Sequence, residues 1–172
     1  MQNERDSSAI KSTLGGVKLV QKIGELLQEK KQFMSVAESC TGGRIAAEIT
    51  QYPNASSTFK GGAVVYETSL KTKILGIPAA YIEKYNVVSE EVAKMMAIRS
   101  CRVFDSQYAI STTGIAGPSK GEGEDPIGTV CIGIATPEGV ITKKFNFGKD
   151  RSEVIEKALN TAFDMLYSEL IK

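Results

Sequence analysis

The chain has 172 residues, of which 42% are hydrophobic and 24% charged, and its net charge is +1 because 21 Lys and Arg balance 20 Asp and Glu. This length fits one domain with a sizeable core. The balanced charge gives no electrostatic reason to expect a nucleic acid or an acidic membrane as partner. The chain contains no histidine, which excludes Ser-His-Asp and Cys-His triads and any metal site with histidine ligands.

The N-terminal residues 1–14 are polar and contain no targeting signal. We expect them to form a disordered leader, and residues 15–172 to form a single domain. No segment has the apolar length needed to span a membrane. The three cysteines, Cys40, Cys101 and Cys131, are far apart and odd in number, which is typical of reduced thiols in a cytoplasmic protein.

Hydrophobic periodicity and turn residues predict the elements in chain order. The first half is predicted to contain a helix at 16–30, a strand at 33–37, a helix that opens after Thr41-Gly42-Gly43, a loop at 52–57 and a strand at 62–66. The second half is predicted to contain helices at 70–75, 79–85 and 92–104, strands at 107–112, 127–135 and 140–147, and a long helix at 154–170. Ser89 is the expected N-cap of the third of these helices. Strands that alternate with helices and end in a hairpin predict an α/β fold with a mixed sheet covered on both faces.

The turn from Glu38 to Arg44 follows a strand and opens a helix. Open α/β sheets bind their ligands at such strand ends. Thr41-Gly42-Gly43 could present free backbone N–H groups and the positive end of the helix dipole to a phosphate. The same residues are equally explained by tight packing at a capped helix, and a serine such as Ser39 is more often a cap than a nucleophile.

A second glycine-rich turn, Gly114-Ile115-Ala116-Gly117-Pro118, follows a later strand. Close backbone approach at Gly114 could bring N–H groups to an anionic oxygen. An ordinary glycine turn that ends at a proline explains the same residues. The chain contains neither a P-loop nor a dinucleotide-binding glycine fingerprint.

Without histidine, a serine nucleophile needs another base, and a desolvated lysine is the usual substitute. Lys71 follows Tyr66 by five residues. Its pKa of about 10.4 in water would have to be lowered by burial or by a cationic neighbour such as Lys73. Tyr66 could relay the proton. The alternative is that both lysines lie on a solvated helix face and Tyr66 lies in the core; a third possibility is an amidase set of Glu38, Cys40 and Lys71.

Five stretches, taken together and in this order, resemble the competence-damage-inducible (CinA) C-terminal domain family. They are VAESCTGG at 36–43, GAVVY at 62–66 with Lys71 after it, VSE at 88–90, TGIAGP at 113–118 and PIGTV at 126–130. The resemblance extends from about Gly16 to Leu170, which is nearly the whole chain.

The resemblance implies a three-layer α/β/α sandwich with a mixed sheet, similar to the anticodon-binding-domain-like fold. It implies hydrolysis of the carboxamide of nicotinamide mononucleotide to the acid, with release of ammonia. Ser39 would be the nucleophile, and Tyr66 and Lys71 would complete a Ser-Tyr-Lys arrangement that needs no metal or cofactor. It also suggests a homodimer or a larger homo-oligomer.

On the same resemblance we expect the substrate to contact both turns and the start of the last helix. The expected substrate-binding residues are Glu38, Cys40, Thr41, Gly42, Gly43, Thr68, Thr113, Gly114, Ile115, Gly117 and Arg151. Thr68 stands where relatives often carry Asn, and Ile155 replaces a second basic residue expected four positions after Arg151; both departures could alter substrate preference. The alternatives are a non-catalytic nucleotide- or partner-binding domain and a Cys40-dependent amidase with another substrate.

Overall fold

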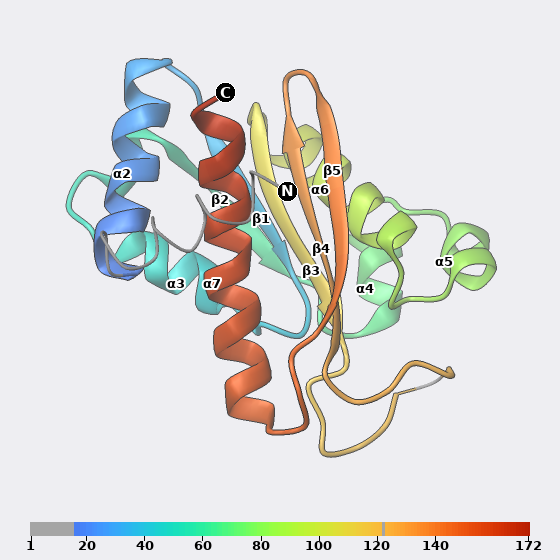
Figure 1. The fold of residues 1–172 in the computed structure, drawn as a ribbon. Helices are drawn as coiled ribbons and strands as arrows, with labels where there is room; N and C mark the ends of the chain where they lie inside the picture. The colour runs from blue at the N-terminus through green and yellow to red at the C-terminus, as the bar shows by residue number, and fades with distance from the viewer. Residues whose placement is uncertain (1–15, 122) are drawn as a thin grey trace.

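A computed structural model of the protein describes residues 16–121 and 123–172 (Figure 1), so the expected leader at 1–14 lies outside the described residues. The strands are β1 (Met34–Glu38), β2 (Phe59–Val64), β3 (Tyr108–Gly114), β4 (Thr129–Thr136) and β5 (Gly139–Asn146). The helices are α2 (Gly16–Glu29), α3 (Arg44–Thr50), α4 (Thr68–Lys73), α5 (Ala79–Tyr85), α6 (Glu90–Phe104) and α7 (Arg151–Leu170), with a 3-10 turn at Ala55–Ser57.

The five strands form one sheet in the order β2-β1-β3-β4-β5. Strands β2, β1 and β3 run parallel, whereas β4 and β5 run antiparallel to their neighbours. The mixed α/β sheet expected from the sequence is therefore confirmed. The first two parallel crossovers place β1 at the centre of the parallel part, so that residues directly after β1 are flanked by the ends of β2 and β3.

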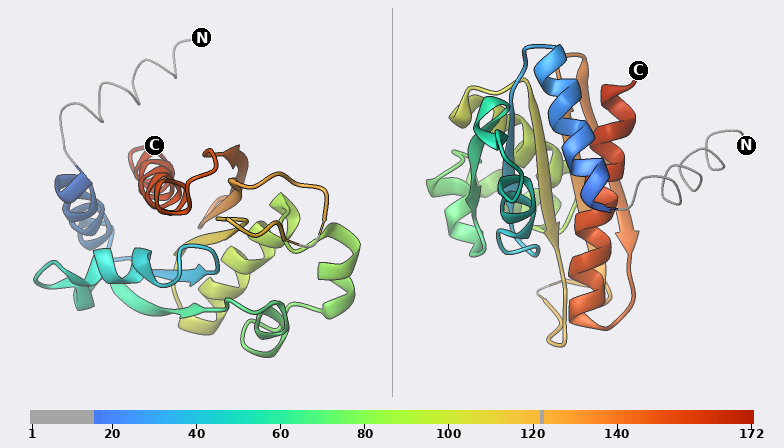
Figure 2. Two further views of the ribbon diagram at one scale, coloured as in Figure 1. Left: turned by 90° about the horizontal axis from the view of Figure 1, so that it is seen from below. Right: turned by 90° about the vertical axis from the view of Figure 1, so that its left-hand side faces the viewer.

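Helices cover both faces of the sheet in three layers, which are seen edge-on in Figure 2. Helices α2, α3 and α7 pack on one face through a core that includes Leu27, Ile45 and Phe163. Helix α6 packs on the other face, where Met96 joins a second apolar cluster with Val65. Burial of these apolar faces, rather than helix propensity, stabilises such elements.

Polar caps define where the two long helices begin. The Ser89 side chain accepts a hydrogen bond from the Val92 N–H, which confirms the expected N-cap of α6. Asp150 does the same for α7 by accepting from the Glu153 N–H, so α7 begins three residues earlier than its apolar pattern predicts. This earlier start places Arg151 at the first position of the helix.

The second strand is shifted relative to its prediction. Residues 62–66 were expected from their apolar run, but β2 begins at Phe59 and ends at Val64. Its side chains alternate between half-buried and exposed, as expected for an edge strand, and Gly61 adopts a positive φ of 137° beside an irregular register with β1. Tyr66 therefore lies beyond the strand, in the connection to α4.

Candidate active site

The carboxyl ends of the three parallel strands meet at one edge of the sheet. Ser39 directly follows β1, Tyr66 follows the neighbouring strand β2, and Gly117 lies in the turn after β3 on the other side. Arg151, from the start of α7, donates to the Tyr66 hydroxyl at 3.0 Å and to the Gly117 carbonyl at 2.6 Å. Because β1 lies between β2 and β3, the Arg151 guanidinium links the segment after β2 with the segment after β3, and these two segments lie on either side of Ser39.

Lys71 and Ser39 are in direct contact. The Lys71 Nζ lies 3.2 Å from Ser39 Oγ and donates at 2.7 Å to the carbonyl oxygen of Val65. Lys71 belongs to α4, and its side chain is only 1% exposed. The solvated-face alternative is therefore wrong for Lys71, although it holds for the exposed Lys73.

Burial lowers the pKa of Lys71 from 10.5 to about 8, and the opposing influence of Cys40 is smaller. The cause is desolvation, because an ammonium group loses more hydration than a neutral amine when it leaves water. At neutral pH about one lysine in ten would then be neutral, against fewer than one in a thousand at the ordinary pKa. Burial alone thus supplies the shift that a lysine base needs.

Tyr66 takes a different place from the one expected. It is 57% exposed, so the alternative that it is a core residue is wrong. Its hydroxyl accepts from Arg151, and among the described residues it makes no hydrogen bond to Lys71 or Ser39. The geometry therefore connects Lys71 to Ser39 directly, without a tyrosine relay between them.

The Glu38 carboxylate accepts hydrogen bonds from the N–H groups at the beginning of α3. This carboxylate, fully buried, accepts hydrogen bonds from four donors. They are Thr41 Oγ1 at 2.6 Å, Gly43 N at 3.0 Å, Ile45 N at 3.2 Å and Ala46 N at 2.8 Å. Of the turn residues expected to bind a substrate phosphate, Gly43 donates its N–H to Glu38, and Gly42 donates its N–H to the Ser39 carbonyl at 3.0 Å. The Glu38 side chain and the first N–H groups of α3 are therefore already engaged within the protein.

Other expected substrate contacts are also enclosed in the protein. The Thr41 side chain is buried against Glu38, and Thr113 Oγ1 donates to the Val87 carbonyl. The Ile115 side chain packs in an apolar cluster with Cys131. These side chains support the site and do not face a ligand, because hydrogen bonds and apolar packing already engage them.

Cys40 is buried directly beside Ser39. Desolvation raises the pKa of its thiol to about 12, although a hydrogen bond with the Thr112 side chain opposes the shift. On the order of one molecule in 10⁵ would then carry the thiolate at neutral pH, and the thiolate is the nucleophilic form. Gly42 and Thr68, in contrast, are exposed.

Two backbone N–H groups near Ser39 are candidates to bind an anionic oxygen. Among the described residues, the Cys40 N–H meets no backbone acceptor. The Ile115 N–H donates to the Thr129 carbonyl at 2.8 Å. Because N–H groups alternate along a strand, Gly114 turns its own N–H away from β4 and toward the end of β1.

Thr112 is the buried residue that sequence reasoning missed. Its side chain lies on β3 and contacts the Thr41 hydroxyl at 2.8 Å and the Ser39 N–H at 3.4 Å. In the sequence it is one of several small residues in a strand, and no local pattern distinguishes it. Only the parallel pairing of β1 with β3, which sets Glu38 opposite Thr112, reveals the contact.

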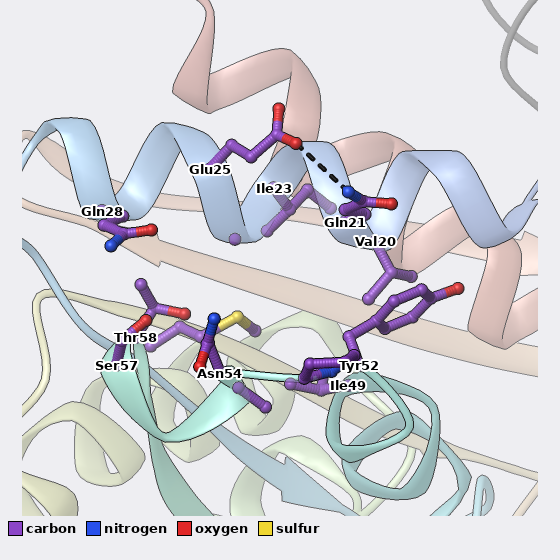
Figure 3. A pocket seen from close by; sticks show the side chains of 14 residues that line it. Val20, Gln21, Ile23, Glu25, Gln28, Ile49, Tyr52, Asn54, Ser57 and Thr58 are labelled. Atoms are coloured by element: carbon purple, nitrogen blue, oxygen red, sulfur yellow. Dashed lines mark hydrogen bonds between the residues drawn. The ribbon is translucent and has the colours of Figure 1, made fainter.

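A cavity of about 180 Å³ lies elsewhere, between α2 and the 52–58 segment (Figure 3). Val20, Ile23 and Ile49 form an apolar side, while Gln28, Asn54 and Thr58 supply polar groups. Met34, the first residue of β1, also lines it. The cavity is thus at the opposite end of β1 from Ser39, and it is separate from the candidate active site.

The part of the chain that the structure describes offers neither a metal site nor a membrane-spanning helix. No group of three or more cysteine, aspartate or glutamate side chains there is arranged to hold a metal ion. None of the described helices combines the length and the hydropathy required to cross a membrane.

Known proteins share this sequence and fold. A model of the CinA C-terminal domain family matches residues 17–170. A CinA-like protein of Flavobacterium psychrophilum is 50% identical over 150 residues, which cover 87% of this chain and 36% of that protein. A putative competence-damage inducible protein of Clostridium perfringens is 41% identical over 158 residues, or 92% of this chain and 38% of that protein. The chain thus spans little more than a third of these curated relatives.

Solved structures with the same fold match this chain over nearly their whole length. The competence/damage inducible protein of Agrobacterium tumefaciens superposes with a TM-score of 0.86 at 30% identity, covering 92% of this chain and 97% of its own. The competence or damage-inducible protein of Enterobacter asburiae gives a TM-score of 0.87 at 28% identity, with coverage of 90% and 98%. The match of the family model to most of the sequence, together with these relatives, places the chain in the CinA C-terminal domain family.

Proposed function

We propose that the protein is a serine amidohydrolase that converts the carboxamide of nicotinamide mononucleotide to the acid and releases ammonia. Ser39 is the nucleophile and Lys71 is its base. The observation that carries the proposal is the contact between a buried lysine amine and the serine hydroxyl, 3.2 Å apart. A serine is a weak nucleophile unless a neighbouring base accepts its proton, and Lys71 is placed to do so.

The first step transfers the Ser39 proton to neutral Lys71 as Oγ attacks the carboxamide carbon. The Val65 carbonyl accepts one N–H of the amine, and this bond holds Nζ within 3.2 Å of Ser39 Oγ. Lys71 then returns the proton to the departing nitrogen, so that ammonia and not an amide anion leaves. Water hydrolyses the acyl-serine with Lys71 again as base, and this step restores the serine hydroxyl.

The developing negative charge on the carboxamide oxygen needs hydrogen-bond donors. The N–H groups of Cys40 and Gly114 are the candidates, because one meets no backbone acceptor among the described residues and the other points toward the end of β1. A donor fixed in this way before the reaction is typically worth about 3 kcal/mol of transition-state stabilisation. No metal or cofactor is required for this chemistry.

Arg151 is the group we assign to the substrate phosphate. Its guanidinium is exposed, and the acceptors that it meets among the described residues are neutral, the Tyr66 hydroxyl and the Gly117 carbonyl. A phosphate offers charged acceptors in a geometry that an arginine fork matches, so it would replace these neutral partners. Tyr66 and the exposed Thr68 would then contact the rest of the nucleotide.

The alternative with Cys40 as nucleophile is less favoured, because burial raises its thiol pKa to about 12.

The three cysteines, Cys40, Cys101 and Cys131, form no disulfide bond. We therefore also propose that the protein works in the cytoplasm, where such thiols stay reduced.

The test is ammonia release from nicotinamide mononucleotide by the purified protein, beside Ser39→Ala and Cys40→Ala. We expect Ser39→Ala to abolish release and Cys40→Ala to retain most of it. Loss confined to Cys40→Ala would instead identify the thiol as the nucleophile. Absence of release by the natural protein would favour a changed substrate or a domain that only binds.

A further inference from the structure

We infer that Thr112 is a positioning residue for the nucleophile, and that a buried chain of hydroxyls from Thr112 through Thr41 to Glu38 fixes the backbone of Ser39. The inference rests on the proposed role of Ser39. Thr112, Thr41 and Glu38 position the Ser39 backbone, although they touch neither the substrate nor the reacting atoms.

Thr112 holds Ser39 through two of its atoms. The Ser39 N–H donates to the Thr112 carbonyl at 3.1 Å and faces Thr112 Oγ1 at 3.4 Å. Both residues are buried, so water does not compete for these contacts. Because β1 and β3 are paired in parallel up to Glu38 and Thr112, the contacts extend the sheet by one residue past the end of β1.

The direction of each hydroxyl proton follows from Glu38. Thr41 Oγ1 donates to the Glu38 carboxylate at 2.6 Å, and this bond uses its single proton. The proton in the 2.8 Å contact between Thr41 and Thr112 must therefore come from Thr112. Thr112 Oγ1 then keeps its lone pairs to accept from the Ser39 N–H.

The chain ends on a rigid anchor. Besides Thr41, Glu38 accepts from the N–H groups of Gly43, Ile45 and Ala46, so the same carboxylate fixes the first turn of α3. Ser39 itself lies in a tight turn, in which its carbonyl accepts from the Gly42 N–H at 3.0 Å. The residue is thus held at its N–H by β3 and at its carbonyl by the turn into α3.

This support matters because the contact between Lys71 and Ser39 is sensitive to small displacements. The two atoms are 3.2 Å apart, and Lys71 is fixed independently by the Val65 carbonyl. Movement of the Ser39 backbone by a few tenths of an ångström would lengthen the contact without changing the base. Misplacement of about 1 Å in an active site costs up to about 100-fold in rate.

The test compares Thr112→Val, which has the same shape without the hydroxyl, with Thr112→Ser, which keeps it. The reaction is labelling of Ser39 by a fluorophosphonate, which reports an activated serine whatever the natural substrate; Ser39→Ala is the unlabelled control. We expect Thr112→Val to label about 10-fold more slowly and Thr112→Ser to label at nearly the natural rate. The pH midpoint of labelling should be unchanged, because Lys71 is untouched.

Ser111→Ala is the matched structural control. The Ser111 hydroxyl is equally buried on β3, but it donates to the Ala93 carbonyl of α6. We expect this variant to lose stability without slower labelling. If Thr112→Val does not fold, the test moves to Thr41, the next hydroxyl in the chain. Thr41→Val removes that hydroxyl and Thr41→Ser keeps it, and we expect the same difference in labelling rate between them.

Natural labelling rates in both valine variants would overturn the inference while leaving the nucleophile intact. Equal slowing in the serine and valine variants would also overturn it, because the hydroxyl would then not be responsible. If the natural protein is labelled but releases no ammonia from the nucleotide, the substrate assignment fails and the inference stands. If the natural protein is not labelled at all, the nucleophile assignment and the inference fail together.

Discussion

Lys71 combines two properties that rarely occur together in a lysine. It is almost completely buried, and no carboxylate among the described residues forms an ion pair with it. A nearby carboxylate would stabilise the ammonium form and raise the pKa, which would oppose the desolvation. Glu38 is close in sequence to Ser39, but its charge is directed into the N–H groups of α3. Desolvation of Lys71 is therefore not offset by an ion pair among the described residues, and it lowers the pKa.

This environment predicts a rising pH profile. Because only neutral Lys71 can accept the Ser39 proton, and its pKa is lowered to about 8, kcat/KM should increase with pH to a plateau with a midpoint near 8. Below the midpoint the rate should fall about 10-fold per pH unit. Ammonia release measured from pH 6 to 10 gives the profile.

Lys71→Arg provides the control for that profile, since a guanidinium stays protonated throughout this range. We expect it to be inactive at every pH. A midpoint near 10 in the natural protein would mean that Lys71 keeps its ordinary pKa and would contradict the desolvation argument.

At the scale of the elements, α6 lies unusually close to β4. A methyl group on Gly133 would come within 2.7 Å of the Ala93 carbonyl oxygen and within 2.6 Å of Ser111 Oγ. These two atoms are themselves hydrogen-bonded, so neither can move away without breaking a buried bond. The absence of a side chain at Gly133 is what allows the helix to approach the sheet.

We therefore expect Gly133→Ala to lower the free energy of unfolding by about 1–3 kcal/mol. Gly24→Ala is the matched comparison, because its methyl group would meet only Thr58 Oγ1 at 3.9 Å, at the edge of the cavity beside α2. That variant should gain about 0.5–1 kcal/mol from better helix propensity. Denaturant unfolding of both proteins measures the two changes, and equal values would contradict the proposed close approach.

Element type was largely predictable from the sequence, whereas the partners of polar side chains were not. The caps and apolar faces of α6 and α7 depend on nearby residues, so their patterns are visible locally. The partners of Glu38 are up to eight residues away on a helix that folds back over β1. Thr112 and Thr41 are separated by 71 positions. The pairing of β1 with β3 brings them together, and composition carries no sign of it.

At the scale of the whole molecule, β2 and β5 are the edge strands of the sheet, and no strand among residues 16–121 and 123–172 pairs with their outer edges. Two consecutive lysines, Lys143 and Lys144, lie on β5, and charge of this kind discourages pairing with another chain. The second half of β2 carries no charge, and Val64 at its end is 48% exposed. Of the two edges, β2 is therefore the better surface for the homodimer that the family resemblance suggests, and we propose that a second copy of the chain pairs there.

The prediction is a mass near twice 18.5 kDa in solution, measured by light scattering during size-exclusion chromatography. Val64→Lys should shift the protein to monomer at micromolar concentration, because a buried lysine between two chains would be unpaired. Ile171→Lys is the control, since Ile171 is equally exposed at 52% but lies at the far end of α7. A dimer that survives Val64→Lys would exclude the β2 edge.

Because Tyr66 lies two residues beyond Val64, a dimer at this edge would also cover part of the segment after β2, where Arg151 contacts the Tyr66 hydroxyl. Activity would then depend on protein concentration.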